Sequence, residues 1–167
     1  MSHTLIQDAL FSAKSVAELD RIAIEQRQIP SLVLMKRAGR SVLTELLETF
    51  GPPSLLSIFC GSGNNAGDGY IVAALAAAKN IQVQVIELSQ NLSQDASSAR
   101  NFAAEANVCF VPFDSSLSIE EGIIVDSLLG TGYLGNLRQP YGEAIQLIND
   151  SGLPLVAVDI PSGLNAD

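Results

Sequence analysis

The chain has 167 residues, of which 47% are hydrophobic and 16% are charged, and its formal net charge is −9. This length suits one domain, and this composition favours a packed core over disorder. The acidic balance argues against nucleic acid and an anionic membrane surface as main partners, because both attract clustered Lys and Arg. No apolar stretch reaches the roughly 18 residues of a membrane span, so we expect a soluble cytoplasmic protein.

Two helices are predicted in the first third of the chain. A helical period of apolar residues begins at Val16 and stops at Pro30. Ser31 can then cap a second helix, whose apolar stripe runs to Phe50 before Gly51-Pro52-Pro53 ends it. Among these residues, Lys36, Arg37 and Arg40 are the nearest approach to a basic patch.

Short apolar runs alternate with helical patterns in the rest of the chain. The predicted strands are 55–60, 81–88, 108–111, 123–129 and 155–160, and the predicted helices between them are 70–79, 94–106 and 140–149. Ser93 or Asp95 can cap the helix 94–106. Such alternation is typical of parallel strands joined by right-handed crossovers. We therefore predict one α/β domain over residues 1–167, with a Rossmann-like, doubly wound, mostly parallel sheet and helices on both faces, in three layers.

The loop from Gly61 to Gly69 (GSGNNAGDG) follows the first predicted strand. It contains the G-x-G-x-x-A pattern of a dinucleotide-binding turn, which lets the backbone approach a pyrophosphate at the start of a helix. The pattern is weak alone, because glycine-rich turns join many strands to helices. Asp68 places a negative charge where a phosphate would lie, and no Lys follows as in a P-loop.

Two carboxylates, Asp126 and Asp159, stand in or at the end of apolar predicted strands. Ligands of open α/β sheets bind at the carboxyl ends of the strands, so we expect both to meet the glycine-rich loop there. Asp126 either accepts N–H bonds from the next helix or binds a hard cation such as K⁺ with Asn65, Ser162 and nearby carbonyls. Asp159 is either a turn cap or a proton-transfer group whose pKa is raised by burial.

A few reactive side chains remain. His3 is the only histidine and lies in the unpatterned start, which excludes a Ser-His or Cys-His triad within this chain. Cys60 and Cys109 lie in apolar runs and are predicted to be buried, reduced thiols. Tyr70 and Tyr141 begin predicted helices; each either lies beside a base or ribose or straddles core and solvent.

Three segments resemble motifs of the NAD(P)H-hydrate epimerase family, also called the YjeF N-terminal domain family. Residues 61–69 resemble its G-x-G-N-N-G-G-D-G loop, 124–132 its V-D-A-L-L-G-T-G segment, and 158–167 its D-I-P-S-G-L-D-A-D segment. Residues 19–20 and 34–39 are similar to the family's opening helices. The resemblance covers the chain from about residue 15 to the end.

The resemblance implies an isomerase of metabolite repair, which interconverts the R and S forms of hydrated NADH and NADPH (NADHX and NADPHX) at the hydroxyl-bearing carbon of the nicotinamide ring. It implies substrate contacts from Asn64, Asn65, Ala66, Gly67, Asp68, Gly130, Thr131, Gly132, Tyr133, Leu134, Gly135, Asn136 and Asp159. It also implies K⁺ bound by Asn65, Asp126 and Ser162. We hypothesise that Asp159 is catalytic and transfers the proton that lets the ring hydroxyl leave or return.

The family also implies a homodimer that works with an NAD(P)H-hydrate dehydratase, which many bacteria fuse to its C-terminus. The family domain continues beyond the motif that ends this chain, so we expect a domain truncated at its C-terminal end.

Two other functions stay open. An NAD-dependent oxidoreductase would use Gly61, Gly63 and Ala66 for the pyrophosphate and Glu87 for the ribose hydroxyls. A non-catalytic nucleotide- or protein-binding module of the same fold would need none of the carboxylates, and the presence of Asp126 and Asp159 argues against it.

Overall fold

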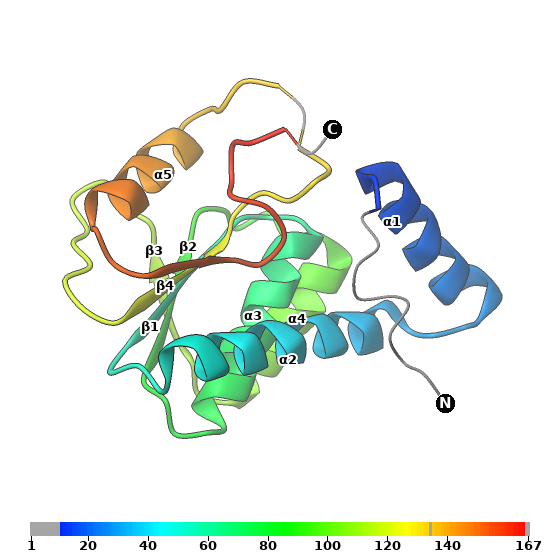
Figure 1. Ribbon diagram of the computed structural model, residues 1–167, viewed down its shortest axis with the longest axis horizontal. Helices are drawn as coiled ribbons and strands as arrows, with labels where there is room; N and C mark the ends of the chain where they lie inside the picture. Colours follow the sequence, from blue (N-terminus) through cyan, green and yellow to red (C-terminus); the bar gives the residue numbers. More distant parts are fainter. Residues whose placement is uncertain (1–10, 134, 166–167) are drawn as a thin grey trace.

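The computed structural model describes residues 11–133 and 135–165, which form three layers (Figure 1). The central sheet contains β1 (Leu56–Cys60), β2 (Val83–Glu87), β3 (Cys109–Pro112), β4 (Ile123–Ser127) and β5 (Leu155–Ala157). The helices are α1 (Ala13–Arg21), the π-helical turn η1 (Ile22–Gln26), α2 (Ser31–Phe50), α3 (Asn64–Ala77), α4 (Gln94–Glu105) and α5 (Tyr141–Asp150). α2, α3 and α4 lie on one side of the sheet and α5 on the other, so the predicted three-layer α/β fold is confirmed.

All strand pairs are parallel, in the order β3-β2-β1-β4-β5. β1 is central, and the chain leaves it first toward β2 and later returns on its other side as β4. The connections after β1 and β4 therefore diverge, and this switch point is where open α/β sheets bind ligands. The backbone amide of Gly61 donates to the Ser127 carbonyl at 3.2 Å, which keeps the ends of the two strands together.

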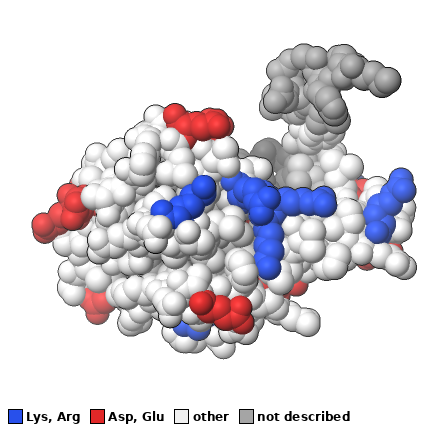
Figure 2. Space-filling model, turned by 90° about the horizontal axis from the view of Figure 1, so that it is seen from below, with Lys and Arg blue, Asp and Glu red and all other residues white. Residues whose placement is uncertain are grey.

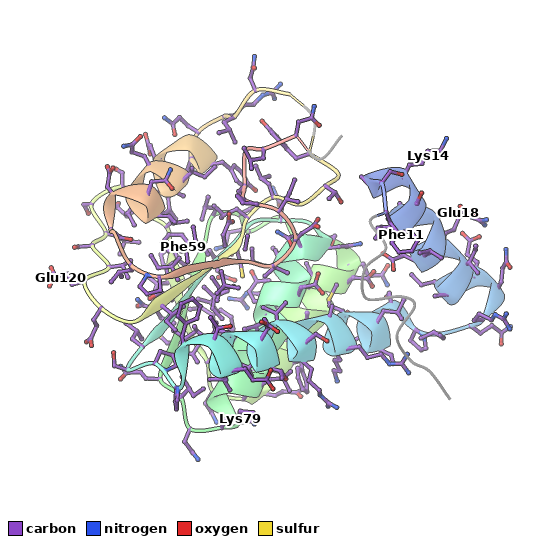
Figure 3. All side chains as sticks on the ribbon, viewed as in Figure 1. Phe11, Lys14, Glu18, Phe59, Lys79 and Glu120 are labelled. Atoms are coloured by element: carbon purple, nitrogen blue, oxygen red, sulfur yellow. The ribbon has the colours of Figure 1, made fainter. Side chains whose placement is uncertain are left out.

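The core has one apolar layer on each face of the sheet. Alternate strand residues point to opposite faces, so Ile58 packs with α3, whereas Phe59 packs with Ala144 and Ile148 of α5. Figure 3 shows Phe59 between the sheet and α5. The side chains of Ile58 and Phe59 are fully buried. The strands thus bury both faces, as expected for a parallel sheet covered by helices.

The predicted start of α3 was wrong, because the helix begins at Asn64 and not near Tyr70. A Cβ on Gly67 would lie 2.5 Å from Met35 Sδ and 3.4 Å from the Cα of Ala96. The small residues of this segment therefore allow α3 to pack closely against α2 and α4. Their polar and glycine-rich composition resembles a loop, but tertiary packing makes it helical.

The predicted caps had mixed outcomes. Ser93 caps α4, with its hydroxyl accepting from the amide of Ala96 at 3.2 Å. Ser31 does not cap α2, since Pro30 occupies the N-cap position. The Ser31 hydroxyl instead donates to Asp95 at 2.7 Å and so links the starts of α2 and α4.

The predicted burial of Cys109 and of Asp159 was wrong, and both residues lie in or just after an edge strand. Cys60 in central β1 is buried, and burial raises the pKa of its thiol well above the ordinary value. Cys109 is exposed, because β3 is an edge strand. β5, at the opposite edge, ends at Ala157 instead of residue 160, so Asp159 lies beyond the sheet.

α1 begins at Ala13, where Ser12 accepts from the amide of Ser15 at 3.2 Å, and it contains no buried residue. Figure 1 shows it to one side of the three layers, and Figure 3 shows Phe11, Lys14 and Glu18 at this end of the molecule. Among the described residues, no helix is both long and apolar enough to cross a membrane.

Basic side chains gather on the α2 side of the molecule, near the middle of the face seen in Figure 2. α2 carries Lys36, Arg37 and Arg40, and the ammonium of Lys36 lies 3.8 Å from the ring centroid of Phe102. These three basic residues form a small patch on one helix of an acidic chain, as their spacing in the sequence predicts.

Gly39 tests the close packing of α2 on α3. In Gly39→Ala the new Cβ would meet Ile71 Cγ2 at 2.7 Å and the Asp68 carbonyl at 3.2 Å. We expect a loss of about 1–3 kcal/mol in the free energy of unfolding, from overpacking. Gly142→Ala is the matched control, because its Cβ would have only Gln139 Oε1 nearby, at 3.9 Å, and helix propensity favours Ala. Urea denaturation of both variants checks this; equal stability changes would contradict it.

Candidate functional site

The start of α3 faces the switch point between β1 and β4. Its N-cap is Gly63, which provides no side-chain hydrogen bond. The amide of Gly67 donates to the Gly63 carbonyl at 3.3 Å, so the amides of Asn64, Asn65 and Ala66 precede the first intrahelical bond. These N–H groups and the helix dipole favour an anion at this position. The glycine-rich segment is therefore the first turn of a helix, and Ala66 fits it without unusual backbone angles.

Asp126 joins the ends of β4 and β5. Its carboxylate is 4% exposed and accepts from the Ser162 amide at 2.8 Å, the Ser162 hydroxyl at 2.6 Å and the Leu128 amide at 3.1 Å. Both backbone donors lie in the segments after β4 and β5, and neither belongs to the next helix, α5. The ion pairs of the described residues use Arg21 and Arg100, so Asp126 has no cationic side chain within this part of the chain.

Asn65 reaches the same place from α3. Its amide nitrogen donates to the Leu129 carbonyl at 3.0 Å, while its Oδ1 is buried without a hydrogen-bond partner. The Ser162 hydroxyl oxygen accepts from the Leu129 amide at 2.9 Å. Asn65, Asp126 and Ser162 therefore meet around Leu129, as the sequence motifs implied.

The donor set around Leu129 fits a singly charged cation. Its members are amide, hydroxyl, carbonyl and carboxylate oxygens, which hard cations prefer. No cluster of three or more His, Cys, Asp or Glu that suits a metal occurs in the parts of the chain that the structure describes. The unsatisfied Oδ1 of Asn65 and the unpaired charge of Asp126 are the two features that a bound K⁺ would satisfy.

Asp159 lies against the loop after β4. Its Oδ2 accepts from the Thr131 amide at 2.7 Å, and a Cβ on Gly130 would lie 2.7 Å from that oxygen and 3.5 Å from Asn65 Cβ. Gly130 therefore allows Asp159 and Asn65 to approach each other. The expectation that Asp159 is buried was wrong: its side chain is exposed, because β5 ends two residues earlier at the sheet edge.

Asp68 is the acidic residue whose electrostatics sequence reasoning missed. It follows Asn65 by three positions in α3, which puts both side chains on one side of the helix. Burial, and then the negative charges of Asp159 and Asp20, raise the pKa of Asp68 to about 7. At neutral pH Asp68 thus retains its proton part of the time, and the charge of Asp159 is one of the causes.

Glu87 and Tyr70 are used inside the protein. The Tyr70 hydroxyl donates to Glu87 at 2.8 Å, and Arg100 donates two bonds to it, at 2.6 and 3.1 Å. Tyr70 is fully buried, so it neither spans the boundary between core and solvent nor lies where a ligand could reach it. Glu87 has both oxygens occupied and is 6% exposed, which removes the ribose ligand that an oxidoreductase would need. Tyr141 lies nearer the site, with Cε1 3.3 Å from the position of a Cβ on Gly61.

The described residues of the second predicted substrate segment, 130–133 and 135–136, lie in the loop after β4. Tyr133 donates its amide to the Gly130 carbonyl at 3.0 Å, and its hydroxyl is buried without a partner. Gly132, Gly135 and Asn136 are exposed. Leu134 and His3 lie outside the described residues.

Two buried side-chain atoms without a hydrogen-bond partner stand out among the described residues: Asn65 Oδ1 and Tyr133 Oη. Both belong to segments that the sequence assigned to a ligand or cation. Buried polar atoms are nearly always satisfied in folded proteins, so these two atoms are the described side-chain groups that a bound species could complete.

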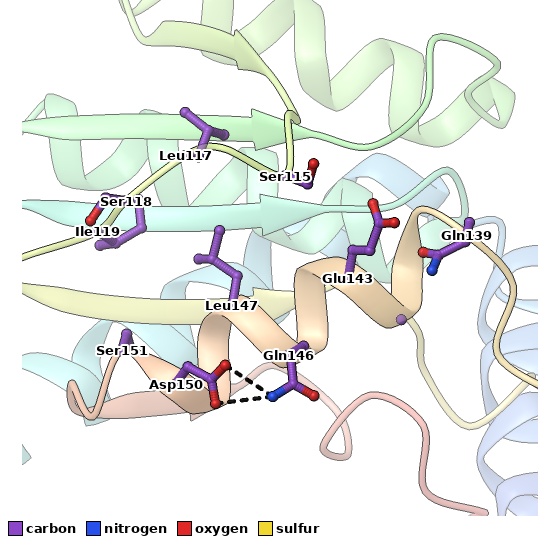
Figure 4. Close-up of a pocket in the computed structure, with 11 residues that line it drawn as sticks. Ser115, Leu117, Ser118, Ile119, Gln139, Glu143, Gln146, Leu147, Asp150 and Ser151 are labelled. Carbon is purple, nitrogen blue, oxygen red and sulfur yellow. Dashed lines mark hydrogen bonds between the residues drawn. The ribbon is translucent and has the colours of Figure 1, made fainter.

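A cavity of about 610 Å³ lies elsewhere, between residues 115–119 and α5 (Figure 4). Gln146 and Asp150 line it and are joined by two hydrogen bonds, at 3.0 and 2.9 Å. It contains none of the predicted site residues. The site is instead formed by the loops at the carboxyl ends of β1, β4 and β5.

Residues 31–167 match the sequence family described as YjeF-related protein N-terminus. The chain belongs to this family. It is 36% identical over 160 residues to a "Bifunctional NAD(P)H-hydrate repair enzyme Nnr" of Coxiella burnetii, covering 95% of this chain and 33% of that protein. It is 33% identical over 175 residues to an "NAD(P)H-hydrate epimerase" of Rhodopirellula baltica, covering 100% of this chain and 70% of that protein.

The crystal structure of the yeast protein YNL200c shares the fold of this YjeF-related chain. The TM-score is 0.79, with 22% identity, and the match covers 95% of this chain and 73% of the yeast chain. The chain thus spans about a third of the bifunctional relative but most of the separate epimerase.

Asp68→Asn should change stability in a pH-dependent way. Folding raises the pKa of Asp68 from near 3.8 to about 7, so ionisation favours the unfolded chain as pH rises through that window. The variant should therefore be more stable than wild type at about pH 8, by on the order of 1–2 kcal/mol after allowing for solvent screening. Near pH 4 the difference should vanish. Denaturant unfolding at both pH values measures this.

Asp114→Asn is the control with the opposite sign, because hydrogen bonds from Ser116 lower the pKa of Asp114. Asp114→Asn should therefore be less stable than wild type at about pH 8, and this difference should shrink in acid. A gain in both variants, or in neither, would contradict the assignment for Asp68.

Proposed function

We propose that this chain is an epimerase domain that interconverts the R and S forms of hydrated NADH and NADPH. The observation that carries the proposal is the meeting of three segments at one edge of the sheet. These are the start of α3 with Asp68, the end of β4 with Asp126, and the segment after β5 with Asp159 and Ser162. Membership of the YjeF-related family and the names of its epimerase relatives support the same activity.

Asn65, Asp126 and Ser162 would hold K⁺ in this proposal, with the Leu129 carbonyl beside them. When bound, the cation supplies a positive charge next to the anion site at the start of α3. The amides of Asn64 to Ala66 bind the phosphates of the dinucleotide, which fixes the position of the rest of the substrate.

The chemistry needs an acid and a base near the ring. The hydroxyl-bearing carbon is bonded to the ring nitrogen, whose lone pair forms a C=N bond as the C–O bond breaks. Asp68 gives its proton to the departing hydroxyl, which leaves as water. Water then adds to the opposite face of the planar carbon, and the proton that it loses goes to Asp159. Proton exchange between the two carboxyl groups restores the starting state.

Asp159→Asn should abolish turnover and spare binding. We expect kcat to fall by about 100-fold or more while KM changes little, since a lost acid–base group typically costs 10²–10⁴-fold. The measurement is R-to-S epimerisation of NADHX, coupled to a dehydratase that consumes only the S form, above the spontaneous rate. Near-normal activity in Asp159→Asn would remove Asp159 from the mechanism.

Asp68→Asn should cause a similar loss of kcat. In wild type the rate should decline as pH rises through about 7, because Asp68 then loses the proton that it donates. Glu120→Gln changes an exposed carboxylate that precedes β4, at the opposite end of that strand from the site (labelled in Figure 3); it serves as the control and should leave the pH profile unchanged. A wild-type rate that is flat from about pH 6 to 9 would contradict the role of Asp68.

Potassium should stabilise the folded chain through Asn65. We expect the Tm of wild type to rise with K⁺ and not with choline, since a ligand of the folded state stabilises it. Asn65→Leu removes the unsatisfied Oδ1 and should abolish the K⁺ response, while Asn64→Leu, at the neighbouring exposed position, should keep it. Equal responses in the two variants would exclude this cation site, whatever the activity.

The proposal extends to the setting of the enzyme. We propose a cytoplasmic homodimer that works with an NAD(P)H-hydrate dehydratase, either fused or separate. The names of the bifunctional relatives support the pairing with a dehydratase. Exposed apolar side chains near α1, namely Phe11, Val16, Leu19 and Ile24, support a contact with a second copy. A chain that binds a partner but leaves the hydrate unchanged would instead be a binding module.

A further inference from the structure

A second cavity, of about 390 Å³, lies beyond the carboxyl end of β2. Residues 89–92, between β2 and α4, form one wall, and Ser97, Arg100 and Asn101 of α4 form the other. The two α4 positions 97 and 101 and the position 100 between them share one face of the helix. Leu92 is the only apolar residue of the lining, and no Asp or Glu is among its residues. The cavity thus presents hydroxyl and amide groups together with one guanidinium.

Arg100 is held in a fixed orientation beside this cavity. Its Nε and Nη2 donate to Glu87 at 2.6 and 3.1 Å, and its Cζ lies 4.3 Å from the ring centroid of Phe110. The Arg100 side chain is 33% exposed, whereas that of Glu87 is 4% exposed and lies outside the lining. Arg100 therefore forms part of the cavity lining, whereas its counter-ion is buried and lies outside that lining.

The cavity adjoins the anion site at the start of α3. Ser93 connects the two, because its amide donates to the Ser62 carbonyl at 2.8 Å and its hydroxyl bonds to Asn64 Oδ1 at 3.2 Å. In dinucleotide-binding sheets, the residues after the second strand face the 2′ position of the adenosine ribose. An acidic residue there binds a free 2′-hydroxyl, and a nearby Arg accommodates a 2′-phosphate. Here the acidic residue, Glu87, is buried and hydrogen-bonded to Arg100, whereas Arg100 itself lines the cavity.

We propose that this cavity binds the phosphate on the 2′ oxygen of the adenosine ribose, so that the chain takes NADPHX in preference to NADHX. The inference rests on the proposed function for the identity of the whole substrate. The binding of the phosphate itself rests on Arg100 and the neutral donors around it. Arg suits this task because its planar donors match phosphate oxygens.

The test measures binding of three nucleotides to the intact chain by calorimetry. Adenosine 2′,5′-bisphosphate should bind about tenfold or more tightly than 5′-AMP, as expected for charge-assisted hydrogen bonds to one added phosphate. Adenosine 3′,5′-bisphosphate carries the same charge and should bind more weakly than the 2′,5′ isomer. Equal affinity for the two isomers would overturn the proposal, because attraction by charge alone would then explain the binding.

Two variants locate the subsite. Ser97→Asp puts a negative charge in the cavity wall and should remove the preference for the 2′,5′ isomer, whereas Ser98→Asp adds the same charge one position away, outside the lining, and should keep it. Loss of the preference in both variants, or in neither, would overturn the assignment. The coupled assay should give a lower KM for NADPHX than for NADHX, and the reverse order would also overturn it. A chain that keeps the nucleotide preference but does not epimerise would instead disprove the proposed function alone.

Discussion

The buried carboxylate of Asp126 holds the site together. Ser162 donates both its amide and its hydroxyl to this group, which fixes the segment after β5 to the end of β4. Asp159 precedes Ser162 by three residues and is thereby placed where the Thr131 amide can donate to it. A buried carboxylate with no cationic side chain is costly unless hydrogen bonds and a bound cation compensate it. In the proposed function, the same residue that fixes the loops would also bind the cation beside them.

Close packing of small residues contributes to the raised pKa of Asp68, the second carboxyl group of the candidate site. Gly39 and Gly67 let α2 and α4 approach α3, and the backbone carbonyl of Asp68 would lie 3.2 Å from a Cβ on Gly39. Burial is the largest cause of its raised pKa, ahead of the charges of Asp159 and Asp20. A wider spacing of the helices would admit water to Asp68 and return it toward an ordinary, fully ionised carboxylate. The packing of this face and the acid–base properties of the site are thus coupled.

The sequence was sufficient for the fold and for placing the predicted site segments at the carboxyl ends of the strands, because both depend on local patterns. Apolar runs alternating with helical periods determine the five strands, and parallel strands bring their carboxyl ends to the same end of the sheet. The sequence could not show that α3 begins at Asn64, since Asn and Gly disfavour helices and only contacts with Met35 and Ala96 make the segment helical. It could not assign burial to Asp159 either, because burial depends on which strand lies at the sheet edge. The pKa of Asp68 depends on neighbours distant in sequence, and no spacing reveals them.

The distribution of charge explains how an acidic chain can bind an anionic dinucleotide. Besides the basic residues of α2, the proposal places favourable contacts for anions at three positions: the start of α3, the proposed cation position at Asn65 and the guanidinium of Arg100. In the proposed binding mode these would hold the phosphates, whereas Asp68 and Asp159 lie where the ring must react. Binding energy then comes from groups that do not take part in proton transfer, and the carboxylates are left to exchange a proton with the ring hydroxyl. This separation allows the phosphate contacts to change, and with them the choice between the two hydrates, without altering the reaction.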